Sequence, residues 1–253
     1  MSNVPAAGHA LDILQLLATR AEPVPASAIA RDLGLPRSSV YHLLGVLTER
    51  GFVAHLAEER RYGLGVAVYE LGSAYQRQAP LQRRARRVMD RLVDAAGLNA
   101  HLAVLHGRDV LYVIEQRAPG QPLLVTDVGV RLPATLTATG LAMLAAVDAA
   151  QLRALFPAAS AFVQRDGRGV GSLSALRTVL QGVRRRGYAV EDGLVSPELG
   201  SVAVAVLDHN AHPEAAVAVT YRQGDVTEDR LDDIVLEVRR AAGAISATLR
   251  GRR

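Results

Sequence analysis

The sequence predicts an α+β protein built from two parts of unequal size. In residues 1–65, three short amphipathic helices precede two short strands, whereas residues 81–253 alternate apolar strands with longer helices. Residues 66–80 fit a helix that links the two parts. A chain of 253 residues is long enough to give each part its own hydrophobic core.

The composition is that of a globular protein, with 49% hydrophobic and 21% charged residues. No apolar run approaches the roughly 18 residues that a membrane-spanning helix needs. The N-terminal residues lack the basic start and the small-residue cleavage site of a secretory signal. We therefore expect a cytoplasmic protein without membrane contact.

Two missing residue types exclude whole classes of chemistry. The chain has no cysteine, and all 29 of its basic residues are arginine. Thiol nucleophiles, cysteine-bound metals, Schiff-base lysines and P-loops are therefore excluded. His209 and His212 flank a turn, which suits solvated side chains better than a rigid zinc site. Neither Gly-x-Ser-x-Gly nor His-Glu-x-x-His occurs, so we expect neither catalysis nor a bound metal or cofactor.

The segment "GLPRSSVYHLLGVLTERGF", residues 34–52, predicts a helix of about four turns. Pro36 suits the first turn and Gly51 suits a left-handed residue after the last. Four apolar residues recur at helical spacing and form one buried stripe, namely Val40, Leu43, Leu44 and Leu47. The opposite face, with Ser38, His42 and Gly45, is then left to the solvent or to a partner.

The surrounding residues predict a winged helix-turn-helix. A helix in "ASAIARDLG" precedes Pro36 with only Gly34 and Leu35 between the two helices, which favours a sharp crossing, and "HALDILQLLATR" supplies a third helix. After the third helix, "FVAHL" and "RYGLG" predict a β-hairpin, which would form a wing.

Such a unit places its third helix in the major groove of DNA, where the N–H groups of the first turn and short polar side chains reach phosphates and base edges. Six arginines against seven acidic residues in residues 1–70 give no excess of positive charge, so the prediction rests on placement. Serines at a helix start are also common caps, and this alternative stays open. The candidate DNA contacts are Ser27, Arg31, Arg37, Ser38, Ser39, Tyr41, His42, Arg60 and Arg61.

The second part predicts a sheet covered by helices. Strands are expected at 99–105, 110–116, 122–127, 188–192, 201–208 and 215–221, with a glycine turn at "HGRD". Helices are expected at 81–97, 137–147, 172–187 and 227–250.

These segments together resemble the IclR family of bacterial transcription regulators. The resemblance includes the helix entry "GLPRSSV" and the hairpin exit "RYGLG", and continues through "VGVRLPATLTATGLAMLA", "RRRGYAVEDG" and "SVAVAVLD". It implies a winged helix-turn-helix domain (1–65), a linker helix (66–80) and an effector-binding domain related to the GAF fold (81–253). It also implies dimers that pair into tetramers.

The resemblance further implies an effector pocket in the second domain. Its lining would be Leu132, Thr137, Ala138, Thr139, Asp192, Ser201, Ala218 and Thr220. The N–H groups at the start of the 137–147 helix, beside threonine hydroxyls, suit a small anion such as a carboxylate. Ser201 and Ala205 replace residues that are often cysteine and proline in the family, and His42 replaces a frequent arginine, so effector and operator sequence stay open.

The predicted function is therefore a DNA-binding regulator, most simply a repressor of a catabolic operon, that responds to an organic acid or aromatic effector. Its partners would be double-stranded operator DNA, the effector and further copies of the chain. Two alternatives remain at this point: a ligand sensor whose winged helix binds a protein partner, and a hydrolase with an accessory winged helix.

Overall fold

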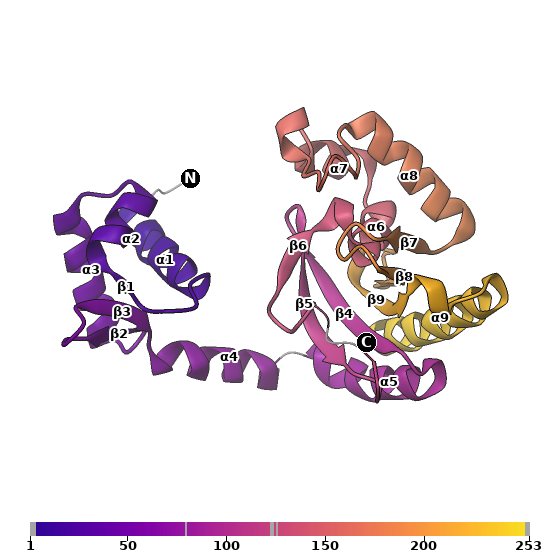
Figure 1. Ribbon diagram of the computed structural model, residues 1–253, viewed down its shortest axis with the longest axis horizontal. Coiled ribbons are helices and arrows are strands. Elements are labelled where there is room, and N and C mark those ends of the chain that lie inside the picture. Colours follow the sequence, from indigo (N-terminus) through magenta and orange to yellow (C-terminus); the bar gives the residue numbers. More distant parts are fainter. Residues whose placement is uncertain (1–3, 79, 122–123, 125, 251–253) are drawn as a thin grey trace. The chain divides into compact units, whose positions relative to one another are not determined.

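The computed structural model describes residues 4–78, 80–121, 124 and 126–250. The chain forms two compact units, Met1–Ala79 and Pro80–Arg253, and each is described by itself. Both helices and strands are abundant, so the predicted α+β class is confirmed (Figure 1). None of the helices in the described ranges is long and apolar enough to span a membrane.

The first unit contains the predicted winged helix-turn-helix. Its elements in chain order are α1 (Pro5–Ala18), β1 (Val24–Pro25), α2 (Ala26–Leu33), α3 (Arg37–Glu49), β2 (Val53–Leu56) and β3 (Arg61–Leu64). The hairpin of β2 and β3, called the wing below, gains β1 on its outer side, in the order β1-β3-β2. The two-residue β1 was not predicted, because it is too short to show a strand period.

Two glycines end the helices as the sequence predicts. Gly34 ends α2 with φ of 65°, and Gly51 follows α3 with φ of 73°, a region that residues with a Cβ rarely adopt. Between these turns, Val40, Leu44 and Leu47 of α3 are buried against α1 and α2, while Leu43 is half-buried. The apolar stripe thus fixes which side of α3 faces away from its own domain.

The helix that follows the wing, α4 (Val66–Gln78), exposes several large apolar side chains. Those exposed by more than half are Val66, Tyr69, Leu71 and Tyr75. Isolated apolar residues on a surface are ordinary, but four exposed on one 13-residue helix leave much of its apolar area open to a partner.

The second unit is a six-stranded antiparallel sheet with helices on both faces, in the strand order β6-β5-β4-β9-β8-β7. Its strands are β4 (Asn99–His106), β5 (Asp109–Gln116), β6 (Arg131–Pro133), β7 (Ala189–Asp192), β8 (Leu199–Leu207) and β9 (Pro213–Arg222). Its helices are α5 (Pro80–Ala96), α6 (Ala138–Ala146), α7 (Ala149–Leu155), α8 (Leu173–Arg186) and α9 (Glu228–Arg250).

One predicted strand is wrong. Residues 122–127 were expected to form a strand, and three of them lie outside the described residues. The other three, Leu124, Thr126 and Asp127, are not in a strand. The sheet's edge strand is instead β6, three residues that pair with β5. An apolar run of this length predicts burial, and Thr126 is buried, but burial alone does not require strand pairing.

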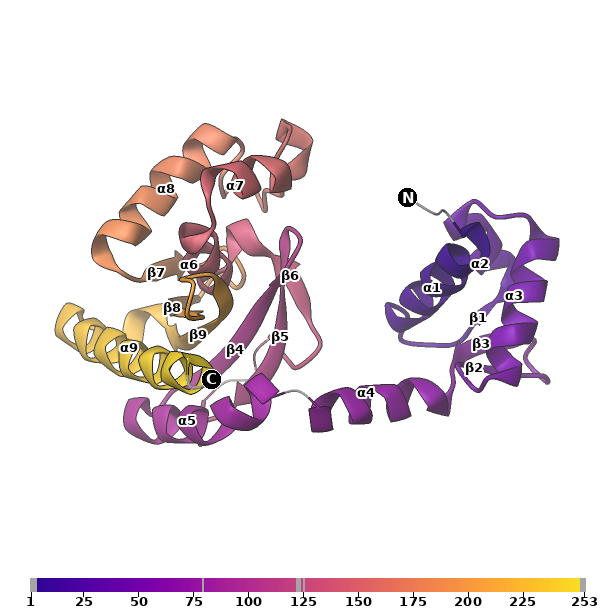
Figure 2. The same ribbon diagram turned by 180° about the vertical axis from the view of Figure 1, so that it is seen from behind.

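The two faces of the sheet differ in the size of their side chains. Helices α5 and α9 cover one face, and α6 and α8 lie on the other (Figures 1 and 2). Valine side chains of β8 and β9 point towards α9, whereas alanines point towards α6, among them Ala103, Ala203, Ala216 and Ala218. Small side chains allow α6 to approach the sheet closely.

Gly140 fixes how the chain enters α6. A Cβ atom at Gly140 would lie 2.1 Å from the backbone oxygen of Ala134. Ala134 begins the short 3-10 turn Ala134–Leu136 that precedes the helix. Backbone atoms cannot rotate aside as a side chain can, so only glycine fits at this crossing.

This contact predicts a loss of stability in G140A. The added methyl group must displace backbone, which should cost about 1–3 kcal/mol and lower the urea midpoint followed by circular dichroism. G182A is the matched control, because Gly182 lies within α8 and a Cβ atom there would have no atom of the described residues outside its own helix turn within 4 Å. There the gain in helix propensity should leave the midpoint unchanged or raise it. A G140A midpoint equal to that of G182A would contradict the proposed crowding.

Candidate functional site

The nine candidate DNA contacts all lie in the first unit, and eight of them are exposed. Arg37, Ser38 and Ser39 form the first turn of α3, whose N-cap is Pro36 without a side-chain cap hydrogen bond. The serines therefore do not cap the helix. Both serines are exposed, and helix geometry leaves the N–H groups of this turn without partners in the helix, as a phosphate-binding helix start requires.

Two of the candidate arginines already bind groups of their own domain. Arg61 is half-buried, and its Nη1 donates to the carbonyl oxygen of Pro23 at 3.1 Å. Arg31 donates through Nε to the carboxylate of Asp32 at 3.0 Å. Arg60 is exposed in the wing turn with φ of 53°. The structure thus gives Arg61 a role in holding the wing to the chain before α2, and makes Arg60 the more accessible of the two wing arginines.

Tyr41 of α3 lies close to the wing. Burial, followed by the nearby Tyr41 hydroxyl, raises the pKa of Tyr62 on β3. The ring of Tyr62 stacks on His55 of β2, with 4.5 Å between the ring centroids. Tyr41 is therefore near the aromatic pair of the wing, and His42 is exposed beside Tyr41 in the sequence of α3.

The second unit contains a pocket between the start of α6 and the facing side of the sheet. Six of the eight predicted effector contacts line it, namely Thr137, Ala138, Thr139, Ser201, Ala218 and Thr220. These residues come from α6 and its N-cap, β8 and β9, so the fold brings distant parts of the sequence together. The pocket also has a lining that the sequence did not predict, which consists of His101, Tyr112, Leu124, Thr126, Glu191, Val195, Ser196 and Leu199.

Leu132 and Asp192 do not line this pocket. Side chains alternate along a strand, and Glu191 pairs with Ser201 while Asp192 pairs with Gly200. Glu191 therefore shares the pocket face, and Asp192 is exposed on the other side. Leu132 lies on the edge strand β6, half-buried against the apolar core under α6. On β7, the residue that lines the pocket is thus the neighbour of the predicted Asp192, and one residue along a strand changes the face of the sheet.

Some of the missed residues left a signal in the sequence. His101 interrupts the apolar strand "NAHLAVL", and a polar residue inside such a strand indicates a polar site. The pocket residues Leu124 and Thr126 belong to the segment that was predicted as a strand. Val195, Ser196 and Leu199 lie in or beside the turn after β7, and no local pattern predicts that this turn folds over the pocket.

Threonine hydroxyls tie the start of α6 to the sheet. The N–H of Gly140 donates to Thr137 Oγ1 at 3.0 Å, and Thr139 Oγ1 donates to the same oxygen at 3.4 Å. Thr139 Oγ1 also lies 3.5 Å from the hydroxyl of Tyr112 on β5. Helix geometry leaves the N–H groups of Ala138 and Thr139 without partners in the helix, and both residues line the pocket.

Glu191 holds the turn that forms another wall of the pocket. Its Oε1 accepts hydrogen bonds from the N–H groups of Leu194 and Val195, the latter at 3.1 Å. On the outside of the turn, Arg168 donates to the carbonyl oxygens of Asp192 and Gly193, and Arg165 donates to that of Val195. Burial is the largest influence on the Glu191 carboxyl and raises its pKa, although the two N–H donors act in the opposite direction.

The pocket is narrow, and no arginine is among the described residues that line it. The space open to the centre of a water molecule is about 20 Å³, roughly enough for one water. In this part of the chain, the groups of the lining that suit an anion are the N–H groups at the start of α6. A ligand as large as a benzoate must move side chains of the wall outward.

His209 and His212 are exposed in the turn between β8 and β9, beside Asp208. Within the described ranges, no group of three or more His, Cys, Asp or Glu side chains is arranged to hold a metal ion.

The raised pKa of Glu191 predicts how E191Q changes stability. Because the folded-state pKa lies above the unfolded one, the wild-type protein loses stability as pH rises through these values. Glutamine keeps an oxygen that accepts from the turn and has no charge to bury. E191Q should therefore unfold at a higher temperature than the wild type at pH 7, and this advantage should shrink as the pH falls to 4.

E198Q is the matched control, because it removes the same charge from an exposed side chain of the same turn. We expect it to leave the melting temperature almost unchanged at both pH values. A melting temperature for E191Q below that of the wild type at pH 7 would show that the carboxylate stabilises the turn more than burial opposes it.

Comparisons with known proteins match both units. Residues 6–57 match the "IclR helix-turn-helix domain", and residues 73–247 match "Bacterial transcriptional regulator IclR C-terminal". The Pca regulon regulatory protein of Pseudomonas putida is 32% identical over 92% of this chain and 79% of its own length. The glycerol operon regulatory protein of Streptomyces coelicolor is 30% identical over 98% of this chain and 97% of its own length.

A solved structure has the same fold. It is an IclR homolog from Microbacterium hydrocarbonoxydans, complexed with 4-hydroxybenzoate, that is 22% identical and covers 96% of this chain and 98% of its own, with a TM-score of 0.79. The match to the IclR C-terminal domain alone extends over more than half of the sequence, and the match to the IclR helix-turn-helix domain covers much of the rest. The chain therefore belongs to the IclR family of bacterial transcriptional regulators.

Proposed function

We propose that this regulator represses a catabolic operon, and that a small organic acid, aliphatic or aromatic, changes its affinity for operator DNA. The observation that carries the proposal is a narrow pocket, lined by hydroxyls and helix N–H groups, in a unit joined by a helix to an outward-facing α3. Because operator DNA in bacteria lies in the cytoplasm, we place the protein there.

The proposed DNA contacts follow from exposure and from the direction of α3. Arg37, Ser38 and Ser39 would hold phosphates at the start of α3, while Tyr41 and His42 would face base edges. Arg60 would reach the backbone from the wing. Ser27 and Arg31 on α2 are exposed and would add backbone contacts. Arg61 supports the wing through its bond to Pro23 and is the weakest of the candidates.

The chemistry of the pocket supports a carboxylate effector. The free N–H groups of Ala138 and Thr139 suit a carboxylate, and the hydroxyls of Ser201 and Thr220, 3.0 Å apart, offer further donors. The related Microbacterium protein is complexed with 4-hydroxybenzoate, which is both a carboxylate and an aromatic compound. Regulators of the pca regulon and of the glycerol operon are among the relatives, which is consistent with a catabolic target.

The size of the pocket supports a coupling mechanism. A benzoate-sized effector has to push the wall outward, so it binds a wider arrangement of the second unit better than the narrow one. Such a difference in affinity is what lets an effector shift an equilibrium between two arrangements.

Self-association would pair the DNA-binding units. We propose a homodimer, and a dimer of dimers, in which the exposed apolar side chains of α4 are covered. The proposed domains are the winged helix-turn-helix (1–65), the linker helix (66–80) and the GAF-like effector domain (81–253).

Of the two alternatives that the sequence left open, only the winged helix that binds a protein partner is retained. Members of this family are transcriptional regulators rather than enzymes, so the hydrolase is not retained. A winged helix that binds a protein partner differs from our proposal in its response to salt, because only phosphate contacts release condensed counterions.

R37A tests the DNA-binding surface. Loss of one phosphate contact should weaken binding to the chain's own upstream region and to unrelated DNA alike, and should lower the slope of log affinity against log salt by about one. R153A is the matched control, because Arg153 is an exposed arginine on α7 of the second unit. Fluorescence anisotropy over a salt series gives both the affinity for DNA and its salt slope.

An R37A protein with the salt slope of R153A would place α3 away from the phosphates. Salt-insensitive or absent DNA binding by the wild type would instead favour the protein-partner alternative.

A further inference from the structure

His101 is a buried polar residue in the wall of the effector pocket. It lies on β4, opposite Ala218 of β9, and its exposed fraction is 1%. The ring meets that of Tyr112 edge-on, with 5.7 Å between the centroids, so packing restricts its orientation. His101 is not among the positions that the family resemblance assigned to the pocket.

The two ring nitrogens of His101 have different surroundings. Nδ1 lies 3.4 Å from the hydroxyl oxygen of Thr126. Nε2 is closed off from solvent and has no hydrogen-bond partner among the described residues. A buried polar atom without a partner is costly, and one at a binding site is commonly satisfied by the ligand.

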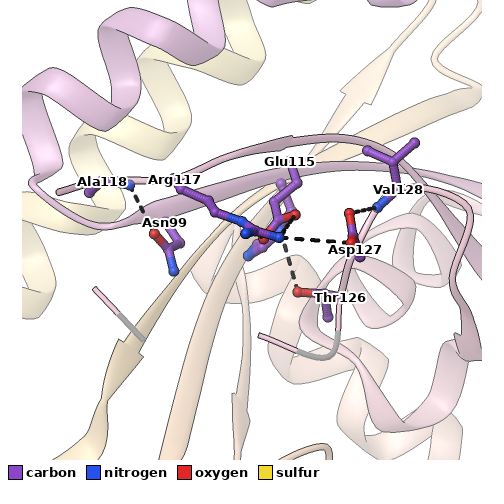
Figure 3. Close-up of polar contacts among 8 residues, drawn as sticks. Asn99, Glu115, Arg117, Ala118, Thr126, Asp127 and Val128 are labelled. Atoms are coloured by element: carbon purple, nitrogen blue, oxygen red, sulfur yellow. Dashed lines mark hydrogen bonds and ion pairs between the residues drawn. The ribbon is translucent and has the colours of Figure 1, made fainter. Parts of the chain in front are cut away.

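The segment that carries Thr126 is held beside the ring by charged groups at the end of β5. Arg117 donates to both carboxylate oxygens of Glu115, at 2.9 and 3.0 Å, and its Nη2 lies 3.8 Å from the carboxylate of Asp127 (Figure 3). The N–H of Val128 donates to the Asp127 carboxylate at 2.7 Å. Thr126 is thereby kept next to Nδ1, which leaves Nε2 as the nitrogen available to a ligand.

The imidazole is uncharged at the pH of a cell. Burial, followed by the positive charge of Arg117, lowers the pKa of His101 to about 4. A neutral imidazole offers one N–H and one lone pair, and the Thr126 hydroxyl can donate to or accept from Nδ1. A hydroxyl on the ligand therefore suits Nε2 in either tautomer, whereas a carbonyl suits only an Nε2 that carries the proton.

We propose that His101 is a specificity-determining residue whose Nε2 binds a second, uncharged polar group of the effector. The effector would then be a monocarboxylic acid that also carries a hydroxyl or carbonyl group. No arginine among the described residues lines the pocket, since Arg117 lies outside the lining and is paired with Glu115 and Asp127, and a second carboxylate would share the pocket with the buried carboxyl of Glu191. The inference rests on the proposed function, because it takes the carboxylate at the start of α6 as given.

Matched acids test this inference with the full-length protein. Isothermal titration calorimetry would compare 4-hydroxybenzoate with 4-methylbenzoate, and lactate with isobutyrate, because each pair exchanges a hydroxyl for a methyl group of similar size. In at least one pair, the wild type should bind the hydroxy acid about tenfold more tightly, which corresponds to about 1.4 kcal/mol. H101F should bring that ratio close to one while the methyl acid still binds.

Three variants complete the design. H106F makes the same substitution at the exposed end of the same strand and should keep the wild-type ratio. H101Q can place its amide near the position of Nε2, and H101N can reach only the position of Nδ1. We expect H101Q to retain part of the preference and H101N to lose it, so the inference stays testable even if H101F does not fold.

The outcomes separate this inference from the proposed function. Three results would overturn the role of His101 alone. The first is an equal preference for the hydroxy acid in wild type and H101F, and the second is equal affinity of the wild type for both acids of each pair. The third is an equal loss of preference in H101Q and H101N. If the wild type binds none of the four acids, the proposed effector class is wrong and the inference falls with it.

Discussion

Burial of polar groups on the α6 side of the sheet is the constraint on which the second unit depends. That face is otherwise covered by alanines and by the apolar core under α6 and α8. Each buried polar group therefore needs a partner from the protein or from a ligand. Glu191 meets this need through two N–H groups of the turn after β7, and Thr137 and Thr139 meet it through Gly140 and Tyr112.

These bonds are also what shapes the pocket. The turn after β7 lies over the sheet because Glu191 holds it from inside and two arginines hold it from outside. The start of α6 lies against β5 because threonine and tyrosine hydroxyls meet there. An effector in the space between them would contact both walls, and in our proposal the same hydrogen bonds would therefore respond to its binding.

The sequence predicted the elements better than the pocket. Helical spacing in "VYHLLGVL" and the glycines at 34 and 51 correctly gave α2, α3 and the direction of their faces, because periodicity and left-handed turns are local properties. On β7 the pocket is lined by Glu191 and not by the predicted Asp192, and the sequence alone does not fix this choice because strand register depends on the partner strand. The sequence did not predict the walls formed by Leu124, Thr126, Val195, Ser196 and Leu199, because their place over the sheet depends on distant residues such as His101, Glu191 and the arginines.

The most direct test asks whether this pocket controls DNA binding. In A218L, the larger side chain should fill the pocket, while the DNA-binding unit is unchanged. We would measure the Kd for the chain's own upstream region with and without 4-hydroxybenzoate, lactate or pyruvate. We expect at least one acid to change the wild-type Kd by about 5- to 150-fold, and the same acid to have no effect on A218L, which still binds DNA. An equal shift in A218L, or an acid that binds the wild type in this pocket without changing its Kd for DNA, would contradict the account.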